Sequence, residues 1–254
     1  MRLSYRGHLL LLRLFRVGSM LPFGLTKEIF RTNFVSLVSS NPPNCRSRAS
    51  LLYTLHPNPT PSMKFIVILA HPRLESYNHA IAGVVCETLR ERGHEVVFHD
   101  LYAEGFDPLL SGGEIFASED ELPHVVRQFI GEIHTADGLI FVHPNWWSGP
   151  PAILRGWIER VFRQGFAYHF TPEGPVPHLT DKEVFVFTTS NTPREIEVNV
   201  YKSPIEHFWK VVVFGLCGCK SFHRTNFEPI ILSTPEDRGR WLEAVRNELL
   251  EVYG

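Results

Sequence analysis

The segment with the most chemical information is His143-Pro-Asn-Trp-Trp-Ser-Gly-Pro-Pro151, in which two adjacent tryptophans stand before a helical pattern. Two neighbouring indoles cannot both point into a core, and a large aromatic surface at the end of a strand suits a flat aromatic ligand. The alternative is that one indole packs under the loop while the other lies on the surface. Pro150 and Pro151 are typical of a helix start.

Two further loops carry polar groups that suit such a ligand. His71-Pro-Arg-Leu-Glu-Ser-Tyr-Asn78 leads into a helix whose first backbone N–H groups lack partners and attract anions. Ser76 and Asn78 add donors, so this loop can hold a phosphate, unless Ser76 only caps its helix. Thr188-Thr-Ser-Asn-Thr-Pro193 offers hydroxyls and amides to the polar edge of a ring, or is an ordinary turn. The sequence contains no Gly-x-Gly-x-x-Gly or Walker loop, which disfavours a dinucleotide or a nucleoside triphosphate in the first loop.

These loops need a scaffold, and the sequence from Met63 onward predicts one. Apolar runs predict strands at 64–70, 95–100, 138–143 and 182–189, with a fifth within 220–232. Helices are predicted near 76–93, 122–135, 153–162, 195–214 and 236–252. This alternation indicates an α/β fold with a doubly wound five-stranded parallel sheet and helices on both faces. Ligands of such sheets bind beyond the carboxyl ends of the strands, where all three loops lie.

Three blocks of the chain stand in a characteristic order and spacing. They are Ile-Leu-Ala-His71 with Ser-Tyr-Asn78; Asp-Leu-Tyr102 with Phe106-Asp-Pro108; and Pro144-Asn-Trp-Trp-Ser-Gly-Pro-Pro-Ala-Ile-Leu-Arg-Gly-Trp-Ile-Glu-Arg-Val-Phe162, followed by Phe166-Ala-Tyr168. Over most of residues 64–250 the chain resembles the flavodoxin-like NAD(P)H:quinone oxidoreductase family, the group of DT-diaphorase and modulator of drug activity B. Nothing before Met63 matches that family.

The resemblance implies a tightly bound flavin, which is FMN in close relatives and FAD in the animal enzymes, and a homodimer. It implies that the flavin phosphate lies against His71, Ser76, Tyr77 and Asn78. The isoalloxazine ring is expected along Pro144, Asn145, Trp146, Trp147 and Ser148, with the backbone N–H groups of the last two near its reactive edge. Its pyrimidine edge is expected against Thr188, Thr189, Ser190 and Asn191.

The implied activity is two-electron hydride transfer from NAD(P)H through the flavin to quinones or similar electrophiles. Trp147 would then form one wall for the stacked nicotinamide and quinone. The animal enzymes carry a paired-glycine loop followed by a Tyr and a His that are thought to relay a proton. Here that loop contains Ser190 and Asn191, and only Tyr201 and His207 follow at comparable places. Trp147, Tyr201 and His207 are therefore the catalytic candidates, although the last two could equally be core or surface residues.

Two other functions remain open from the sequence. Some relatives bind potassium-efflux transporters and gate them, so the chain could be a flavin-binding regulatory subunit. A one-electron carrier similar to flavodoxin is the third possibility, which the tryptophan loop disfavours because it matches the reductases. Yellow colour together with NAD(P)H-dependent quinone consumption would distinguish the enzyme from both.

Residues 1–62 differ in composition from the rest of the chain. They carry eight basic residues against one acidic residue, clustered prolines and no sustained apolar period. The Arg- and Ser-rich composition is similar to an organelle transit peptide, but a disordered tail or translated upstream sequence before a start at Met63 fits better, because such a composition buries little apolar surface. The flavin-binding domain is therefore predicted to be residues 63–254.

The charge and cysteine content of the chain limit the kinds of molecule that it is expected to bind and the compartment in which it is expected to lie. Residues 63–254 carry 17 basic and 26 acidic residues, and this acidic balance argues against nucleic acid as a partner. The leucine run at 9–12 is far too short to cross a bilayer. Four cysteines over this length give no disulfide framework, so we expect a reducing, cytoplasmic location. Cys217-Gly-Cys219 has no second cluster of Cys or His at ligand spacing, so we expect no bound metal.

Overall fold

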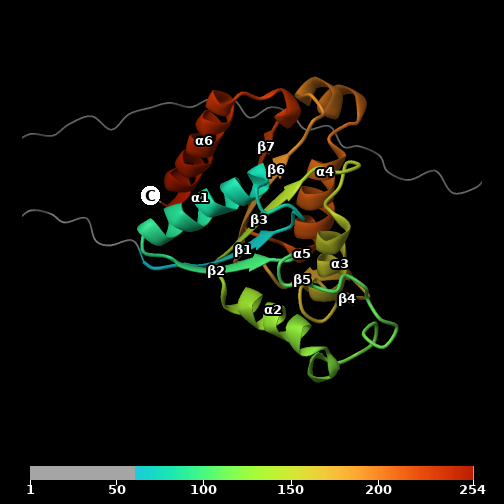
Figure 1. The fold of residues 1–254 in the computed structure, drawn as a ribbon. Coiled ribbons are helices and arrows are strands. Elements are labelled where there is room, and N and C mark those ends of the chain that lie inside the picture. The colour runs from blue at the N-terminus through green and yellow to red at the C-terminus, as the bar shows by residue number, and fades with distance from the viewer. Residues whose placement is uncertain (1–60, 254) are drawn as a thin grey trace, which may run out of the picture. The chain divides into compact units, whose positions relative to one another are not determined.

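The computed structural model describes residues 61–253 (Figure 1), so the expectations for the N-terminal segment fall almost entirely outside the described residues. Five strands form the central sheet in the order β2-β1-β3-β6-β7, and every neighbouring pair is parallel. They are β1 (Lys64–Leu69), β2 (Glu95–Asp100), β3 (Gly138–Pro144), β6 (Glu183–Thr189) and β7 (Ser221–Phe227). The predicted doubly wound, flavodoxin-like sheet is confirmed.

Helices cover both faces of this sheet (Figure 1). One face packs against α1 (Tyr77–Glu91) and α6 (Pro235–Tyr253), and the other against α2 (His124–Thr135), α3 (Ala152–Val161), α4 (Pro204–His207) and α5 (Phe214–Cys217). In β1, Phe65 and Val67 join the core beneath α1 and α6, while Ile66 and Ile68 join the core on the opposite face. Side chains alternate between faces along a strand, so a strand that is covered on both sides must be apolar throughout.

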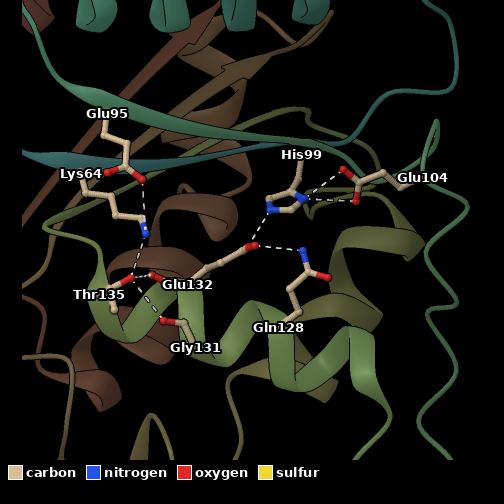
Figure 2. Close-up of polar contacts among 8 residues, drawn as sticks. All are labelled: Lys64, Glu95, His99, Glu104, Gln128, Gly131, Glu132 and Thr135. Carbon is tan, nitrogen blue, oxygen red and sulfur yellow. Dashed lines mark hydrogen bonds and ion pairs between the residues drawn. The ribbon is translucent and has the colours of Figure 1, made fainter.

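A buried histidine links α2 to the edge of the sheet (Figure 2). The His99 ring lies between two carboxylates, with Nδ1 2.9 Å from Glu104 Oε1 and Nε2 2.8 Å from Glu132 Oε2. Through one contact at each ring nitrogen, the imidazole joins β2 to the following loop and to α2. At the same edge Lys64 Nζ lies 3.4 Å from Glu95 Oε1, in a pair that is much more exposed to solvent.

The single helix predicted over 195–214 is wrong, because the structure breaks it. A π-helical turn, η2 (Ile196–Val200), is followed by Lys202 and Ser203 with φ of 63° and 51°. Chain direction then changes before α4, and a second π-helical segment, η3 (Phe208–Val213), precedes α5. Pro204 explains the break, because a proline disfavours helical geometry in the preceding residue and supplies no N–H.

Two short strands were not predicted. They form a separate antiparallel hairpin, β4 (Tyr168–Thr171) with β5 (Gly174–Pro177), and two 3-10 turns, η1 (Glu119–Glu121) and η4 (Ile230–Leu232), complete the described elements. None of the hairpin side chains is buried, so no buried face imposes an apolar period on the sequence. Within residues 61–253 no helix is both long and apolar enough to span a bilayer.

Candidate active site

The carboxyl ends of β1, β3 and β6 open into a cavity of about 620 Å³. Ten of the predicted cofactor residues line it: His71, Ser76, Tyr77, Asn78, Pro144, Asn145, Trp146, Thr189, Ser190 and Asn191. The three loops meet because β1 pairs with β3 and β3 pairs with β6, so parallel strands end at the same edge. This is the position at which open α/β sheets bind ligands.

One end of the cavity is built to bind an anion. Ser76 is the N-cap of α1, and its Oγ accepts a hydrogen bond from the His79 backbone N–H at 3.3 Å. The remaining first-turn N–H groups and the helix dipole favour negative charge here. Arg73 and Arg238 also line this end, together with one acid, Glu75. Two guanidinium groups and a helix N-terminus outweigh a single exposed carboxylate.

Two of the predicted phosphate residues are engaged with protein groups. The Asn78 side chain is buried, and its Nδ2 donates to Thr189 Oγ1 at 2.9 Å, which links the start of α1 to the end of β6. The Tyr77 hydroxyl donates to the Arg238 carbonyl at 2.7 Å, and burial raises the pKa of Tyr77 to about 12. Both side chains therefore fix the cavity walls while bordering the cavity.

The tryptophan loop forms a tight turn at the other end of the cavity. The Trp146 and Gly149 backbones exchange two hydrogen bonds of 3.0 Å, and the two residues between them, Trp147 and Ser148, have φ of 53° and 61°. Positive φ at both central residues is the type I′ geometry, which is strained for residues other than glycine, asparagine and aspartate. Such strain is concentrated at functional sites.

This turn exposes both aromatic rings and two backbone donors. Trp147 is fully exposed, and the Trp146 ring, which is 43% exposed, lies 5.8 Å from the His71 ring. The Trp147 and Ser148 N–H groups donate to no backbone carbonyl of the described residues. The turn thus presents aromatic surface and free N–H donors in the same place.

A buried histidine supports the turn from below. His143 Nδ1 donates to the Pro144 carbonyl at 2.8 Å, and its Nε2 accepts from Trp209 Nε1 at 3.0 Å. Burial lowers the pKa of His143 to about 4, so the ring is neutral, as its one acceptor and one donor contact require. His143 is therefore a structural residue that orients the loop.

A second cavity of about 440 Å³ continues the first beyond the turn. It is lined by Asn145, Trp147, Ser148, Thr192, Glu197 and Tyr201, and it shares Asn145 and Thr192 with the first cavity. The cleft therefore extends from the start of α1 to Trp147. At the junction, Asn145 Oδ1 is buried and accepts no hydrogen bond from the described residues. An unpaired buried acceptor is costly, so it indicates a ligand donor at this point.

These features test whether a flavin fits. A flavin nucleotide has a phosphate at one end and a flat ring with an N–H donor and hydrogen-bond acceptors at the other. The cleft offers an anion site, an unpaired amide oxygen and then free backbone N–H groups beside exposed indoles, in that order. The residues fit the group.

Two of the predicted residues lie outside both cavities, and a third borders the second cavity. Thr188 is fully buried, and its Oγ1 donates to Asn226 Oδ1 at 2.7 Å, away from the cavities. His207 is exposed at the end of α4 and borders neither cavity. Tyr201 is 53% exposed and borders the second cavity.

Sequence reasoning missed Arg238 and Glu197. Arg238 comes from the first turns of α6, and nothing in the sequence distinguishes it from the neighbouring Arg240. Glu197 falls in the segment that was predicted as one continuous helix, so its proximity to the cavity was hidden. Thr192, which also lines both cavities, belongs to the third loop that the sequence predicted.

No group of metal-binding side chains occurs in the part of the chain that the structure describes. Cys86, Cys217 and Cys219 are free thiols, and burial raises the pKa of Cys217 and of Cys219 to about 12. Thiols of this kind remain protonated and unreactive at neutral pH.

Residues 63–252 match the family model described as the flavodoxin-like fold. An uncharacterized NAD(P)H oxidoreductase of Haemophilus influenzae is 34% identical over 71% of this chain and 91% of its own length. NAD(P)H dehydrogenase [quinone] 1 of Rattus norvegicus is 34% identical over 74% of this chain and 77% of its own. The structure of an NAD(P)H:quinone oxidoreductase from Methanothermobacter marburgensis superposes with a TM-score of 0.65 at 27% identity, over 73% of this chain and 96% of that one.

An FMN-dependent NADH-azoreductase from Bacillus anthracis, solved in complex with FMN, shares the fold with a TM-score of 0.64 at 15% identity, over 76% of this chain and all of that chain. The sheet order, the cleft at its carboxyl edge and the similarity over nearly the whole described region agree with one another. This chain belongs to the flavodoxin-like family of NAD(P)H oxidoreductases.

Proposed function

We propose that this chain is a flavin-dependent NAD(P)H:quinone oxidoreductase that binds FMN in the cleft at the carboxyl edge of its sheet. The observation that carries the proposal is the order of groups along that cleft. An anion site at the start of α1 is followed by the unpaired Asn145 oxygen and then by the strained turn at Trp147. The relatives named as quinone dehydrogenases and the azoreductase solved with FMN support the same reading.

Residues of this chain would bind FMN as follows. The N-terminus of α1, with Arg73 and Arg238, would neutralise one terminal phosphate. Asn145 Oδ1 would accept a hydrogen bond from the ring, and the Trp147 and Ser148 N–H groups would donate to its edge. The bound flavin supplies hydride transfer, accepting two electrons from NAD(P)H and passing them to an acceptor.

The second cavity is the place we assign to the substrates. Its two aromatic side chains, Trp147 and Tyr201, offer faces for a nicotinamide or quinone ring. Because one cavity would serve both, donor and acceptor must occupy it in turn. The oxidised nicotinamide then has to leave before the quinone enters.

Purified protein tests this proposal directly. We expect a yellow protein, release of FMN rather than FAD on heat denaturation, and NAD(P)H oxidation that depends on an added quinone. Initial rates at several fixed quinone concentrations should give parallel double-reciprocal lines, because the two substrates alternate. Absence of bound and bindable flavin would contradict the proposal, and intersecting lines would place donor and acceptor in separate sites.

The surface supports a homodimer, which we include in the proposal. Leu110, Ile115 and Val212 are exposed apolar side chains, yet they line one further cavity of about 430 Å³ beside α3. Contiguous exposed apolar surface is typical of protein interfaces. Light scattering on the purified protein should give twice the chain mass.

The free thiols of the described region also support a reducing compartment, and we therefore propose a cytoplasmic location.

A further inference from the structure

One side chain gives the second cavity its charge. Glu197 is the only charged residue among the described residues that line this cavity, and its side chain is 6% exposed. Arg224 Nη2 in β7 donates to Glu197 Oε1 at 2.9 Å, in a buried ion pair that indicates an ionised carboxylate. The cavity that we assign to the nicotinamide and quinone rings therefore borders a buried negative charge.

The groups around Glu197 do not cancel this charge. Arg224 is shared, because its Nη1 also lies 3.7 Å from Glu206 Oε2 in α4. Asn226 Nδ2 donates to Glu197 Oε2 at 3.3 Å and also contacts the carboxyl group of Glu228. Burial raises the pKa of Glu228, yet even a proton on Glu228 leaves two carboxylates against one guanidinium group. The surroundings of the cavity are therefore net negative.

The other cations of this region offset Glu197 weakly. Arg194 and Lys202 lie on either side of the π-helical turn that carries Glu197, and both are exposed. Water and salt screen exposed charges much more strongly than buried ones. Arg73 and Arg238 line the first cavity, where the phosphate of FMN would neutralise them. In the flavin-loaded protein the negative charge therefore dominates at the place that we assign to the substrate ring.

We propose that Glu197 selects the electron acceptor by charge, an inference that rests on the proposed quinone reductase function. A ring with a negative substituent would approach a buried carboxylate, and like charges repel strongly where water is partly excluded. An uncharged quinone meets no such repulsion. NAD(P)H enters the cavity with an uncharged nicotinamide ring, since its negative charges belong to its phosphates. Uncharged quinones are therefore the acceptor class of this chain, and quinones that carry a sulfonate or a carboxylate are poor acceptors.

The test measures kcat/KM for two acceptors, with the flavin-loaded enzyme and saturating NAD(P)H. One acceptor is ortho-naphthoquinone, and the other is its ring-sulfonated form, which carries one negative charge. In Glu197→Gln we expect kcat/KM for the sulfonate to rise about tenfold, because a like charge is removed, whereas the value for the uncharged quinone should change by at most about twofold. Each acceptor is compared with itself, so the difference in their intrinsic reactivity cancels.

Glu195→Gln is the matched control for this experiment. Glu195 is an exposed neighbour that lines neither cavity, and the substitution removes the same charge. It should therefore alter kcat/KM for neither acceptor. Flavin content and Tm of both variants, measured in parallel, show that each protein is folded and loaded.

Ionic strength gives a second readout, which a purely structural role of Glu197 would not produce. Added salt screens the repulsion that an anionic acceptor meets as it approaches the cavity, so in the parent protein kcat/KM for the sulfonate should rise relative to that for the uncharged quinone. Glu197→Gln should flatten this dependence. If Glu197→Gln does not fold, the parent decides the matter, and a ratio that falls or stays level with added salt overturns the proposal.

The remaining outcomes separate this proposal from the proposed function. An equal change for both acceptors in Glu197→Gln, or no rise for the sulfonate, would show that Glu197 does not select by charge. A parent protein that reduces neither acceptor with NAD(P)H would instead contradict the quinone reductase function itself.

Discussion

At the scale of single residues, Trp147 is the most exposed of the large apolar side chains that the structure describes. Its ring contributes nothing to the core, and its position is set by the turn that it forms with Ser148. A side chain of this kind can contact a ligand without supporting the fold. Replacing it therefore tests its role in activity separately from its role in stability.

We therefore expect Trp147→Ala to keep its flavin and to unfold at nearly the parent Tm. Loss of an aromatic stacking contact, worth about 0.5–1.5 kcal/mol, should lower kcat/KM about twofold to tenfold for both NAD(P)H and quinone. Steady-state kinetics and a thermal melt measure the two effects. A large fall in Tm would show that the indole supports the fold, and unchanged kinetics would move the stacking wall to Tyr201 or to a partner subunit.

His143 lies beneath that turn and couples stability to pH. Its pKa falls from the usual 6.5 to about 4 in the folded protein. Between these two pH values the unfolded chain therefore binds a proton at His143 and the folded chain does not. The contribution of His143 to the free energy of unfolding should be complete above about pH 6.5. It should fall by up to roughly 3 kcal/mol as the pH drops to 4. Urea melts across this range should show a flatter pH dependence for His143→Gln than for the exposed His207→Gln. Parallel profiles would contradict the assignment.

At the scale of elements, the attachment of α2 to the sheet edge combines the contacts of a buried histidine ring with a more exposed ion pair (Figure 2). His99→Leu removes the ring that contacts the Glu104 and Glu132 carboxylates and leaves Glu132 with its contact to Gln128 alone, so we expect a loss of about 1–3 kcal/mol in the free energy of unfolding. Glu95→Gln removes only a solvent-exposed partner of Lys64 and should cost at most about 1 kcal/mol. Chemical denaturation of both variants checks the difference. Equal costs would mean that the buried ring adds nothing beyond a surface pair.

Elements with at least one buried face were predictable from the sequence, because burial imposes a pattern of apolar residues. The β1 run and the α3 stripe are clear for this reason, and their boundaries differ from the prediction by one or two residues. Exposed or interrupted elements carry no such pattern. The β4–β5 hairpin has no buried face, and the apolar period of 195–214 continues through the break at Pro204.

The same distinction applies to the site. The three loops were found because each follows a strong strand, and a parallel sheet brings their ends together. Arg238 and Glu197 were missed because their positions depend on how α6 and η2 pack, which no local spacing encodes. His207 was expected near the catalytic centre by comparison with the animal enzymes, yet the break before Pro204 leaves it exposed and outside both cavities.

At the scale of the whole molecule, the described core begins with the first strand. Met63 packs against the core beneath α1, and Ser62 is exposed with one hydrogen bond to the Gly93 carbonyl at 2.9 Å. We expect a protein that begins at Met63 to keep full flavin content and the parent Tm. Thermal melts and absorbance spectra of the full-length protein and of the protein that begins at Met63 provide the measurement. Insolubility or loss of flavin in the shorter protein would make the N-terminal segment part of the fold.

The parallel sheet also determines how this chain reaches its native state. Lys64 pairs with Glu95, Gly138 with Phe65 and with Glu183, and Glu183 with Ser221, so no strand of the main sheet pairs with a close neighbour in sequence. Each pairing must first close a long loop, which costs chain entropy before any contact is formed. High contact order of this kind slows folding, and the apolar strands stay exposed to other chains meanwhile. The topology that creates the cleft therefore makes newly synthesised chains prone to aggregation until β1 has acquired both of its neighbours.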